Sequence, residues 1–339
     1  MKHLSNTALS MLDLVAVREG GTTAQALQIA LLTAQHVERL GFQRYWLAEH
    51  HNMAGVASSS TAVLVGHIAG GTSKIRVGSG GIMLPNHAPL VVAEAFGTLA
   101  ELYPNRIDLG LGRAPGTDQF TMRALRRHNT ESADDFPREV SELMSYLSPA
   151  QEGQRITAHP GAGTQVPIWL LGSSLFSAQL AAQMGLPYAF ASHFAPALLL
   201  QALDVYRRTF KPSAQLAKPY AIIGVPLIAA PTDEEAQFLA SSVYKRVYGM
   251  LTGRRGKLPL PDAAFMSSID SASRAAIHDF LAAGVIGSPE TVRSGLEELL
   301  DQTQADEIMF VCDVHDPALR LRSLDIAARV MRQAEPALA

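Results

Sequence analysis

Short apolar segments alternate with amphipathic helical patterns along almost the whole chain. A helix between two strands returns the chain in the same direction, so each repeat of this unit requires parallel strand pairing. The alternation occurs eight times, and an eightfold unit closes more naturally as a barrel than as an open sheet. The sequence therefore predicts one α/β domain over residues 1–339, a (β/α)8 TIM barrel. Its strands are expected at 9–15, 45–48, 75–84, 106–112, 168–171, 188–191, 220–229 and 307–312.

Helical patterns follow these strands, at 24–40, 58–70, 89–103, 136–147, 176–184 and 197–210, from 232, from 288, and at 317–333. Two irregular insertions interrupt the alternation, at 114–133 after strand four and at 249–271 after strand seven. The first is predicted as a polar loop, and it is far longer than an ordinary connection of about 2–6 residues, which favours a lid or a substrate wall. The basic run Gly253–Lys257 in the second is interpreted as a solvated loop.

Composition excludes several classes of function. The formal net charge of −3 and the pI near 6.4 argue against a nucleic-acid-binding surface, which is usually strongly basic. The single cysteine, Cys312, excludes an internal disulfide and a cysteine-based metal cluster, and its apolar surroundings predict a buried core position. With no apolar run of transmembrane length and no signal sequence at the N-terminus, we expect a cytoplasmic protein that acts on a small molecule and does not bind membranes.

The strongest candidate site follows the second strand, where Glu49, His50 and His51 come directly after the apolar segment Tyr45–Ala48. In an α/β barrel the loops after the strands form the active face, so titratable groups at this position indicate chemistry. The alternative is that all three residues only tie down a loop. Other strand ends carry further candidates: Asp13, the glycines at 78–81, Arg113, Gly172, Ser173, Ser174 and His193.

Gly172, Ser173 and Ser174 lie at the start of a predicted helix, where free backbone N–H groups, hydroxyl donors and the helix dipole together favour a phosphate. A plain helix cap is the alternative. Arg113 follows strand four directly, and its planar guanidinium suits a phosphate dianion on the adjacent side of the same cavity.

The glycines Gly78, Gly80 and Gly81 at the end of strand three allow a flat ligand to approach the bare backbone, although turns also use glycine freely. A phosphate seat next to such a platform suggests flavin mononucleotide (FMN) more than a dinucleotide. The run 110–116 superficially resembles a dinucleotide fingerprint, but Pro115 falls in its turn and no helical pattern follows.

At these residues the chain resembles the bacterial luciferase-like flavin monooxygenase superfamily. It is most similar to a subgroup of single-subunit bacterial oxidoreductases rather than to luciferase itself. The resemblance runs over nearly the whole length, and the order and spacing of its segments make it specific. These segments are Ser10–Asp13, Tyr45–Asn52, Gly78–Gly81, Pro104–Arg113, Leu171–Ser174 and Asp306–Met309.

The resemblance implies a barrel that binds reduced FMN as a diffusible cosubstrate, delivered by a separate flavin reductase, and that uses O₂ to oxidise a small organic substrate. His50 matches the catalytic histidine of the family. Arg113 and Ser173–Ser174 match the phosphate-binding positions, and Gly80–Gly81 match a turn where the family often has a non-proline cis peptide under the flavin ring. A homo-oligomer is also expected by this analogy. The only cysteine lies in the last strand and not near the flavin, so light emission is not supported.

The leading hypothesis is an FMN-dependent monooxygenase of a small, apolar substrate, with His50 and Glu49 as catalytic residues and with no metal. A deazaflavin (F420) enzyme that transfers hydride without O₂ is one alternative, and a flavin-binding protein without turnover is another. A metal hydrolase that uses Glu49, His50 and His51 is disfavoured, because adjacent residues at one strand end rarely converge on one ion.

Overall fold

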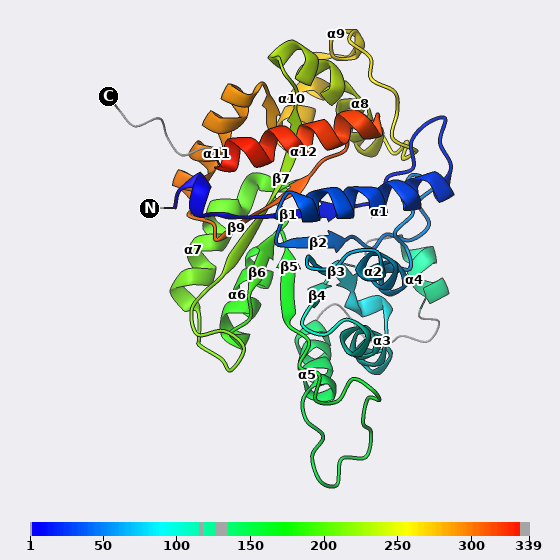
Figure 1. Ribbon diagram of the computed structural model, residues 1–339, viewed down its shortest axis with the longest axis vertical. Helices are drawn as coiled ribbons and strands as arrows, with labels where there is room; N and C mark the ends of the chain where they lie inside the picture. Colours follow the sequence, from blue (N-terminus) through cyan, green and yellow to red (C-terminus); the bar gives the residue numbers. More distant parts are fainter. Residues whose placement is uncertain (1, 115–117, 126–134, 333–339) are drawn as a thin grey trace.

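The computed structural model describes residues 2–114, 118–125 and 135–332. Its sheet has the order β6-β5-β4-β3-β2-β1-β9-β7-β8, and β6 also pairs with β7, so eight parallel strands of the described chain close into a barrel. The helices surround this barrel (Figure 1). The predicted (β/α)8 TIM barrel with insertions after its fourth and seventh strands is confirmed. The strands are β1 Ala8–Asp13, β2 Arg44–Leu47, β3 Arg76–Met83, β4 Ile107–Gly112, β5 Ile168–Gly172, β6 Tyr188–Phe190, β7 Ala221–Ala229, β8 Val285–Gly287 and β9 Glu307–Val311.

Local sequence signals set most helix ends. Thr22 and Gln25 form a capping box at the start of α1, and Gly185, with a φ of 63°, ends α6 in the left-handed region. None of the helices in the described ranges is both long enough and apolar enough to cross a membrane. The helices are α1 Thr23–Arg39, α2 Thr61–Gly70, α3 Pro89–Leu102, α4 Gln119–Leu125, α5 Phe136–Leu147, α6 Leu175–Met184, α7 Leu199–Thr209, α8 Asp233–Leu251, α9 Phe265–Ser268, α10 Ser271–Phe280, α11 Pro289–Thr303 and α12 Pro317–Arg332.

The structure corrects the sequence prediction in the two insertions. The stretch after β4, predicted as a polar loop over 114–133, contains the short helix α4, while residues 115–117 and 126–134 lie outside the described residues. The stretch after β7 ends in α9 and α10 and is followed by β8, which pairs with the last residues of β7 outside the barrel. None of these four elements was predicted. The elements α4, α9 and β8 are short and have little apolar periodicity of their own, whereas α10 is a ten-residue amphipathic helix that the sequence prediction missed.

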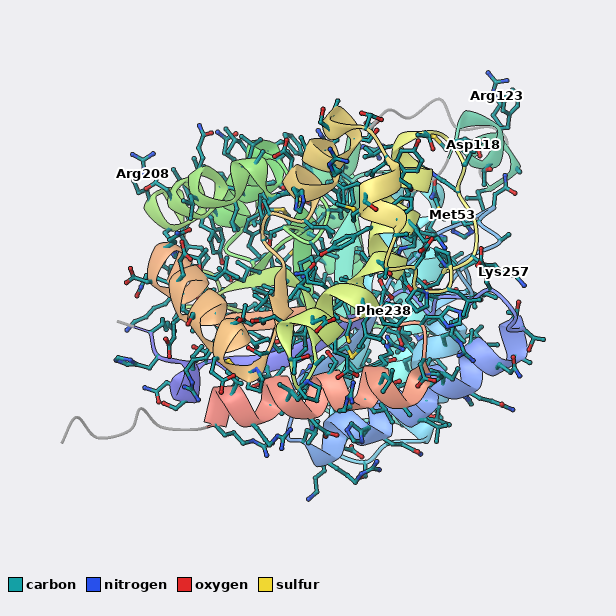
Figure 2. The ribbon with its side chains drawn as sticks, turned by 90° about the horizontal axis from the view of Figure 1, so that it is seen from above. Met53, Asp118, Arg123, Arg208, Phe238 and Lys257 are labelled. Atoms are coloured by element: carbon teal, nitrogen blue, oxygen red, sulfur yellow. The ribbon has the colours of Figure 1, made fainter. Side chains whose placement is uncertain are left out.

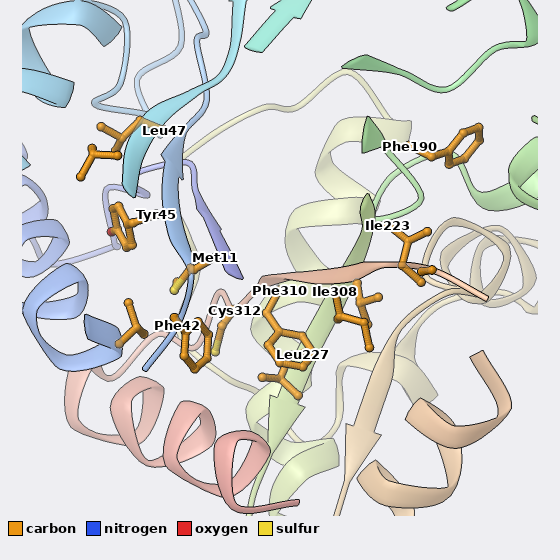
Figure 3. Close-up of a cluster of buried hydrophobic side chains, with 14 of the residues drawn as sticks. Met11, Phe42, Tyr45, Leu47, Phe190, Ile223, Leu227, Ile308, Phe310 and Cys312 are labelled. Atoms are coloured by element: carbon orange, nitrogen blue, oxygen red, sulfur yellow. The ribbon is translucent and has the colours of Figure 1, made fainter. Parts of the chain in front are cut away.

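An apolar layer fills the space between the strands and the surrounding helices. Met11, Tyr45 and Phe310 point outward from β1, β2 and β9 into this layer, and Phe42 and Cys312 lie beside them (Figure 3). Cys312 is fully buried directly after β9, and burial raises the pKa of its thiol to about 11. The predicted core position of this cysteine is confirmed.

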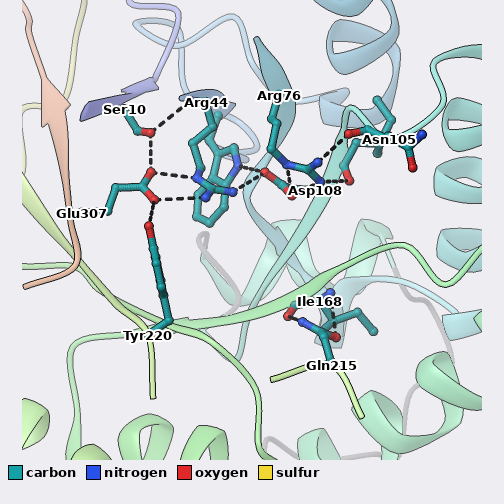
Figure 4. A network of polar contacts seen from close by, with 11 residues as sticks. Ser10, Arg44, Arg76, Asn105, Asp108, Ile168, Gln215, Tyr220 and Glu307 are labelled. Atoms are coloured by element: carbon teal, nitrogen blue, oxygen red, sulfur yellow. Dashed lines mark hydrogen bonds and ion pairs between the residues drawn. The ribbon is translucent and has the colours of Figure 1, made fainter. Parts of the chain in front are cut away.

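The inside of the barrel is apolar in its middle and polar at the amino ends of the strands. The apolar part consists of Leu12, Trp46, Ala48, Trp169, Ala189, Ile222, Met309 and Val311. Below it, Arg44 on β2 forms ion pairs with Asp108 on β4 at 2.8 Å and with Glu307 on β9 at 2.7 Å, and Arg76 on β3 also pairs with Asp108 (Figure 4). We call these four residues the floor network. It links four strands across the barrel and fills its amino end with paired charges.

Candidate active site

The residues predicted to form the site lie within or directly after four consecutive strands: Gly80–Gly81 are inside β3, Gly172 ends β5, and His50 and Arg113 follow β2 and β4. β2, β3, β4 and β5 pair in parallel, with Leu47 opposite Ser79, Met83 opposite Gly112, and Gly112 opposite Leu171. His50, Gly80–Gly81, Arg113 and the Gly172–Ser174 turn therefore come at the same end of the barrel. This is the carboxyl end, where the loops of such barrels carry chemistry.

The Gly80–Gly81 peptide bond is cis, as the resemblance implied. At the same place the β3–β4 register shifts, because Ser79 pairs with Leu109 whereas Ile82 pairs with Leu111, which is one extra residue on β3. A Cβ on Gly80 would lie 2.6 Å from Leu12 Cδ1, and a Cβ on Gly81 would lie 2.6 Å from Gly110 O. At Gly81 an added Cβ would collide with backbone, so that position requires glycine, whereas at Gly80 it would displace the Leu12 side chain.

Arg113 and the β5–α6 turn are brought together by a ring contact. The guanidinium carbon of Arg113 lies 4.3 Å from the ring centroid of Phe176, which is in the first turn of α6. This cation–π contact holds a permanent positive charge beside the amino end of α6. The helix dipole and the charge of Arg113 therefore act on the same position, and both favour an anion.

The Gly172–Ser174 turn is fixed by residues that sequence reasoning did not find. Ser177 Oγ donates to Ser174 O at 2.8 Å, and Tyr188 OH lies 3.1 Å from Ser177 Oγ. A Cβ on Gly172 would lie 2.4 Å from Ser177 Oγ, so the turn needs glycine there. Ser174 occupies the N-cap position of α6, but its side chain makes no capping hydrogen bond. The Ser174 hydroxyl therefore does not accept a hydrogen bond from the first N–H groups of α6, as an N-cap side chain usually does.

His50 lies near a second histidine, His193, which follows β6. Burial lowers the pKa of His193 to about 4, and the nearby His50 and Arg246 act in the same direction while Asp313 opposes them. Nδ1 of His193 is buried without a hydrogen-bond partner among the described residues, and a Cβ on Gly224 in β7 would lie 2.4 Å from it. His193 is therefore a neutral imidazole packed on the backbone of β7.

Glu49 does not share the position of His50. Its carboxylate is buried, and Oε1 lies 3.0 Å from His51 Nε2 and 2.8 Å from His87 Nε2. His87 follows the 3-10 turn Leu84–Asn86 after β3. The sequence analysis did not find it, although its place shortly after the end of a predicted strand is the same signal that pointed to His50.

Asp13, another candidate at a strand end, belongs to a structural network outside the cavity. Its carboxylate accepts hydrogen bonds from the Val15 N–H, at 2.8 Å, and from the Tyr45 hydroxyl, and it pairs with Arg320 of α12 at 2.9 Å. These partners stabilise the junction between β1, β2 and α12. Asp13 is therefore not available to the cavity.

One side of the carboxyl end of the barrel is held together by main-chain hydrogen bonds. Val17 N–H donates to Gly55 O at 2.9 Å, and Leu258 N–H donates to Val17 O at 2.9 Å. We call the three segments 15–19, 53–57 and 256–258 the rim ribbon. Figure 2 shows Met53 and Lys257 of this ribbon, and Asp118 of the insertion after β4, on one side of the molecule. The second insertion is thus a fixed wall at this point, and its basic run is exposed, as predicted.

Comparisons with known proteins agree with this fold. The family model described as luciferase-like monooxygenase matches residues 7–307. A Bacillus subtilis protein, YvbT, is 52% identical over 96% of this chain and 97% of its own, and a luciferase-like monooxygenase of Escherichia coli strain K12 is 48% identical over 96% and 97%.

Among solved structures, apo-MsnO8 is 38% identical with a TM-score of 0.89, and covers 96% of this chain and 98% of its own. More distant structures share the fold alone. They include the oxygenating constituent of 3,6-diketocamphane monooxygenase in complex with FMN, at 17% identity and a TM-score of 0.71 over 96% of this chain and 97% of its own. The family match over most of the sequence and the high identity of the two relatives lead to one conclusion: the chain belongs to the luciferase-like monooxygenase family.

Proposed function

We propose that this protein is an FMN-dependent monooxygenase that takes reduced FMN from a separate flavin reductase and uses O₂ to oxidise a small, apolar organic molecule. The observation that carries the proposal is the position of the Arg113 guanidinium over Phe176, at the amino end of α6. This is a seat for a phosphate of a mononucleotide, on the strand next to the Gly80–Gly81 platform. When bound there, reduced FMN would supply the electrons for O₂ activation.

The residues of the site fit such a ligand. Arg113, Gly172, Ser173 and Ser174 would bind the phosphate, through the guanidinium, the hydroxyls and the N–H groups of the turn. Gly80 and Gly81 would contact the ring system through their backbone, since any side chain there would collide with Leu12 or with Gly110. The apolar interior below, which includes Trp46 and Trp169, would exclude water from the reacting atoms.

His50 would hold or move the proton that the reaction requires. An imidazole titrates near neutral pH and serves in both directions, which typically contributes a factor of about 10²–10⁴. Glu49 would serve the same step indirectly, because its bonds to His51 and His87 fix the loop that carries His50. His193, kept neutral by burial, would add no positive charge beside His50.

The relatives support a monooxygenase of this kind. An N-acetyl-S-alkylcysteine monooxygenase of Bacillus subtilis is 39% identical over 187 residues, 54% of this chain and 56% of its own. The deazaflavin alternative is kept because an F420-dependent secondary alcohol dehydrogenase has the same fold, with a TM-score of 0.69 at 14% identity. FMN is favoured over the deazaflavin because Arg113 and the amino end of α6 offer one position for an anion, which matches the single phosphate of FMN. We further propose a cytoplasmic homo-oligomer that folds as one domain.

Flavin binding to Arg113→Ala tests the proposal. Loss of the guanidinium should weaken FMN about 10–100-fold, the value of a charge-assisted hydrogen bond, and should weaken riboflavin, which has no phosphate, by less than about 3-fold. Both flavins are titrated in oxidised and reduced form by absorbance and fluorescence. Arg123→Ala, an exposed arginine on α4, is the matched control and should bind FMN as the wild type does.

Equal losses for FMN and riboflavin would remove the phosphate role of Arg113. The same titration with a deazaflavin separates the two cofactor hypotheses, because only the proper cofactor should show a saturable spectral change at micromolar protein. Oxygen consumption with reduced FMN that is the same with and without protein would favour a binding protein without turnover.

A further inference from the structure

Glu49, His51 and His87 form a second cluster beside the proposed flavin site. Oε1 of Glu49 lies 3.0 Å from Nε2 of His51 and 2.8 Å from Nε2 of His87, and all three atoms lie within 4.8 Å of one another. Two of these residues follow β2, and His87 follows β3 after a turn. The cluster therefore joins two neighbouring loops at the mouth of the barrel.

The three side chains are the ligand types that transition metals prefer. Two imidazole nitrogens and one carboxylate oxygen make the His₂Glu set of a three-ligand zinc site, in which the fourth position stays open. Ligand atoms about 2.0–2.2 Å from one ion in tetrahedral geometry are about 3.3–3.6 Å apart. The observed separations reach this geometry with small side-chain movements. Imidazole and carboxylate together favour Zn²⁺, Co²⁺, Ni²⁺ or Cu²⁺ over Mg²⁺ or Ca²⁺.

The charges in the cluster also favour a cation. The side chain of Glu49 is only 1% exposed, and within the described residues its ion-pair partners are the two histidines and no lysine or arginine. A buried carboxylate needs a compensating positive charge, which a bound cation would supply. The side chains of His51 and His87 are 14% and 28% exposed, so the cluster opens to solvent on their side. An ion could enter there and keep a water as its fourth ligand.

We propose that Glu49, His51 and His87 bind one divalent transition-metal ion, with Zn²⁺ the best match to the ligand set. The ion replaces two N–H···O hydrogen bonds by three metal bonds, and each Nε2 proton moves to Nδ1 or to solvent. It neutralises the buried carboxylate and clamps the loop after β2 to the loop after β3. The site is distinct from the proposed flavin seat and does not depend on it, because it shares none of its residues.

Direct metal binding tests this proposal. The protein, without an added histidine tag, is stripped with a chelator and dialysed, and Zn²⁺ is then titrated by calorimetry. Co²⁺ is titrated in parallel by its visible absorption, which reports coordination by nitrogen and oxygen ligands. We expect one ion per chain, with an affinity that falls as the pH is lowered, because protons compete for the ligating nitrogens.

Variants separate the metal site from the hydrogen bonds that already exist there. His87→Gln keeps an N–H donor for Glu49 but removes a ligand, so it should fold normally and lose at least about 10-fold in affinity. Glu49→Gln removes the charge and should lose as much. His3→Ala, an exposed histidine near the N-terminus, should bind like the wild type.

Thermal unfolding gives a second readout that requires no activity. Zn²⁺ should raise the Tm of the wild type and of His3→Ala, but not that of His87→Gln. The reason is that the ion stabilises the folded state only where that state binds it. The absence of stoichiometric binding, or binding that His87→Gln leaves unchanged, would overturn the proposal and leave a hydrogen-bonded Glu–His–His cluster. Failure of FMN binding would leave this result untouched, so the two proposals fail separately.

Discussion

Neighbouring side chains in the loop after β2 serve different purposes. Glu49 and His51 contact His87 at the rim, whereas His50 lies near His193, on the β7 side of the cavity. Three adjacent titratable residues are thus separated into two groups by the loop that follows β2. The sequence predicted a site at this strand end, but it did not show which of the three residues act together.

At this scale His50→Ala is the direct test of the proposed proton transfer. The variant should bind FMN within about 3-fold of wild type, because the imidazole is not part of the phosphate seat. The return of oxidised-flavin absorbance after reduced FMN is mixed with O₂ should slow by a factor of about 10²–10⁴, the usual contribution of a well-placed acid or base. Stopped-flow absorbance measures the rate.

His67→Ala, on α2, controls for the loss of any histidine and should leave that rate unchanged. If oxidised-flavin absorbance returned in His50→Ala at the wild-type rate, His50 would not be the group that transfers the proton.

At the scale of elements, the rim ribbon depends on a close approach of two backbones. A Cβ on Gly55 would lie 2.0 Å from Gly256 O, whereas a Cβ on Gly256 would meet nothing within 4 Å. Gly55 is buried and Gly256 is exposed. The two glycines therefore face each other in one contact, but an added side chain would cause a steric clash only at Gly55.

Gly55→Ala should detach segment 256–258 from the other two segments of the rim ribbon, at a cost of about 1–3 kcal/mol for an overpacked contact. Because Arg254, Arg255 and Lys257 lie in the insertion after β7, limited digestion with trypsin should cut there faster than in the wild type. Gly256→Ala is the matched control and should be cut at the wild-type rate. Equal protection in both variants would mean that the wall does not rest on this contact.

Most elements were predictable because their signals are local. The strand at Ala221–Ala229 is continuously apolar, and α1 has both a capping box and an apolar face, so each was found within a few residues of its ends. The strand β8, only three residues long, carries no pattern of its own and exists through its pairing with β7. Tertiary contacts, rather than local propensity, also bring His87 to Glu49 and Phe176 to Arg113. The spacing of these residues along the chain does not predict such contacts.

At the scale of the whole molecule, the floor network joins strands that are far apart in the sequence. Arg44 reaches Glu307 and Asp108, which are buried on β9 and β4. Arg44→Met would leave both carboxylates with one partner fewer in an apolar interior. We expect a loss of about 3–5 kcal/mol in the free energy of unfolding, because removing one member of a buried ion pair strands the other.

Urea unfolding at neutral pH measures this loss. Arg208→Ala is the control, because its pair with Asp204 on α7 is exposed, and it should change the free energy by no more than about 0.5 kcal/mol. A similar midpoint for both variants would show that the interior tolerates the unpaired charges, as it would if water reached them.

The floor network also affects how ligands enter and leave the barrel. Paired arginines and carboxylates fill the amino end of the barrel. We therefore expect ligands to enter and leave at the carboxyl end. In a barrel that is open at one end, the ligand that binds last must dissociate first. If FMN binds at the proposed phosphate seat with the substrate between it and the carboxyl end, the oxidised product would have to leave before FMN, and product release would follow a fixed order.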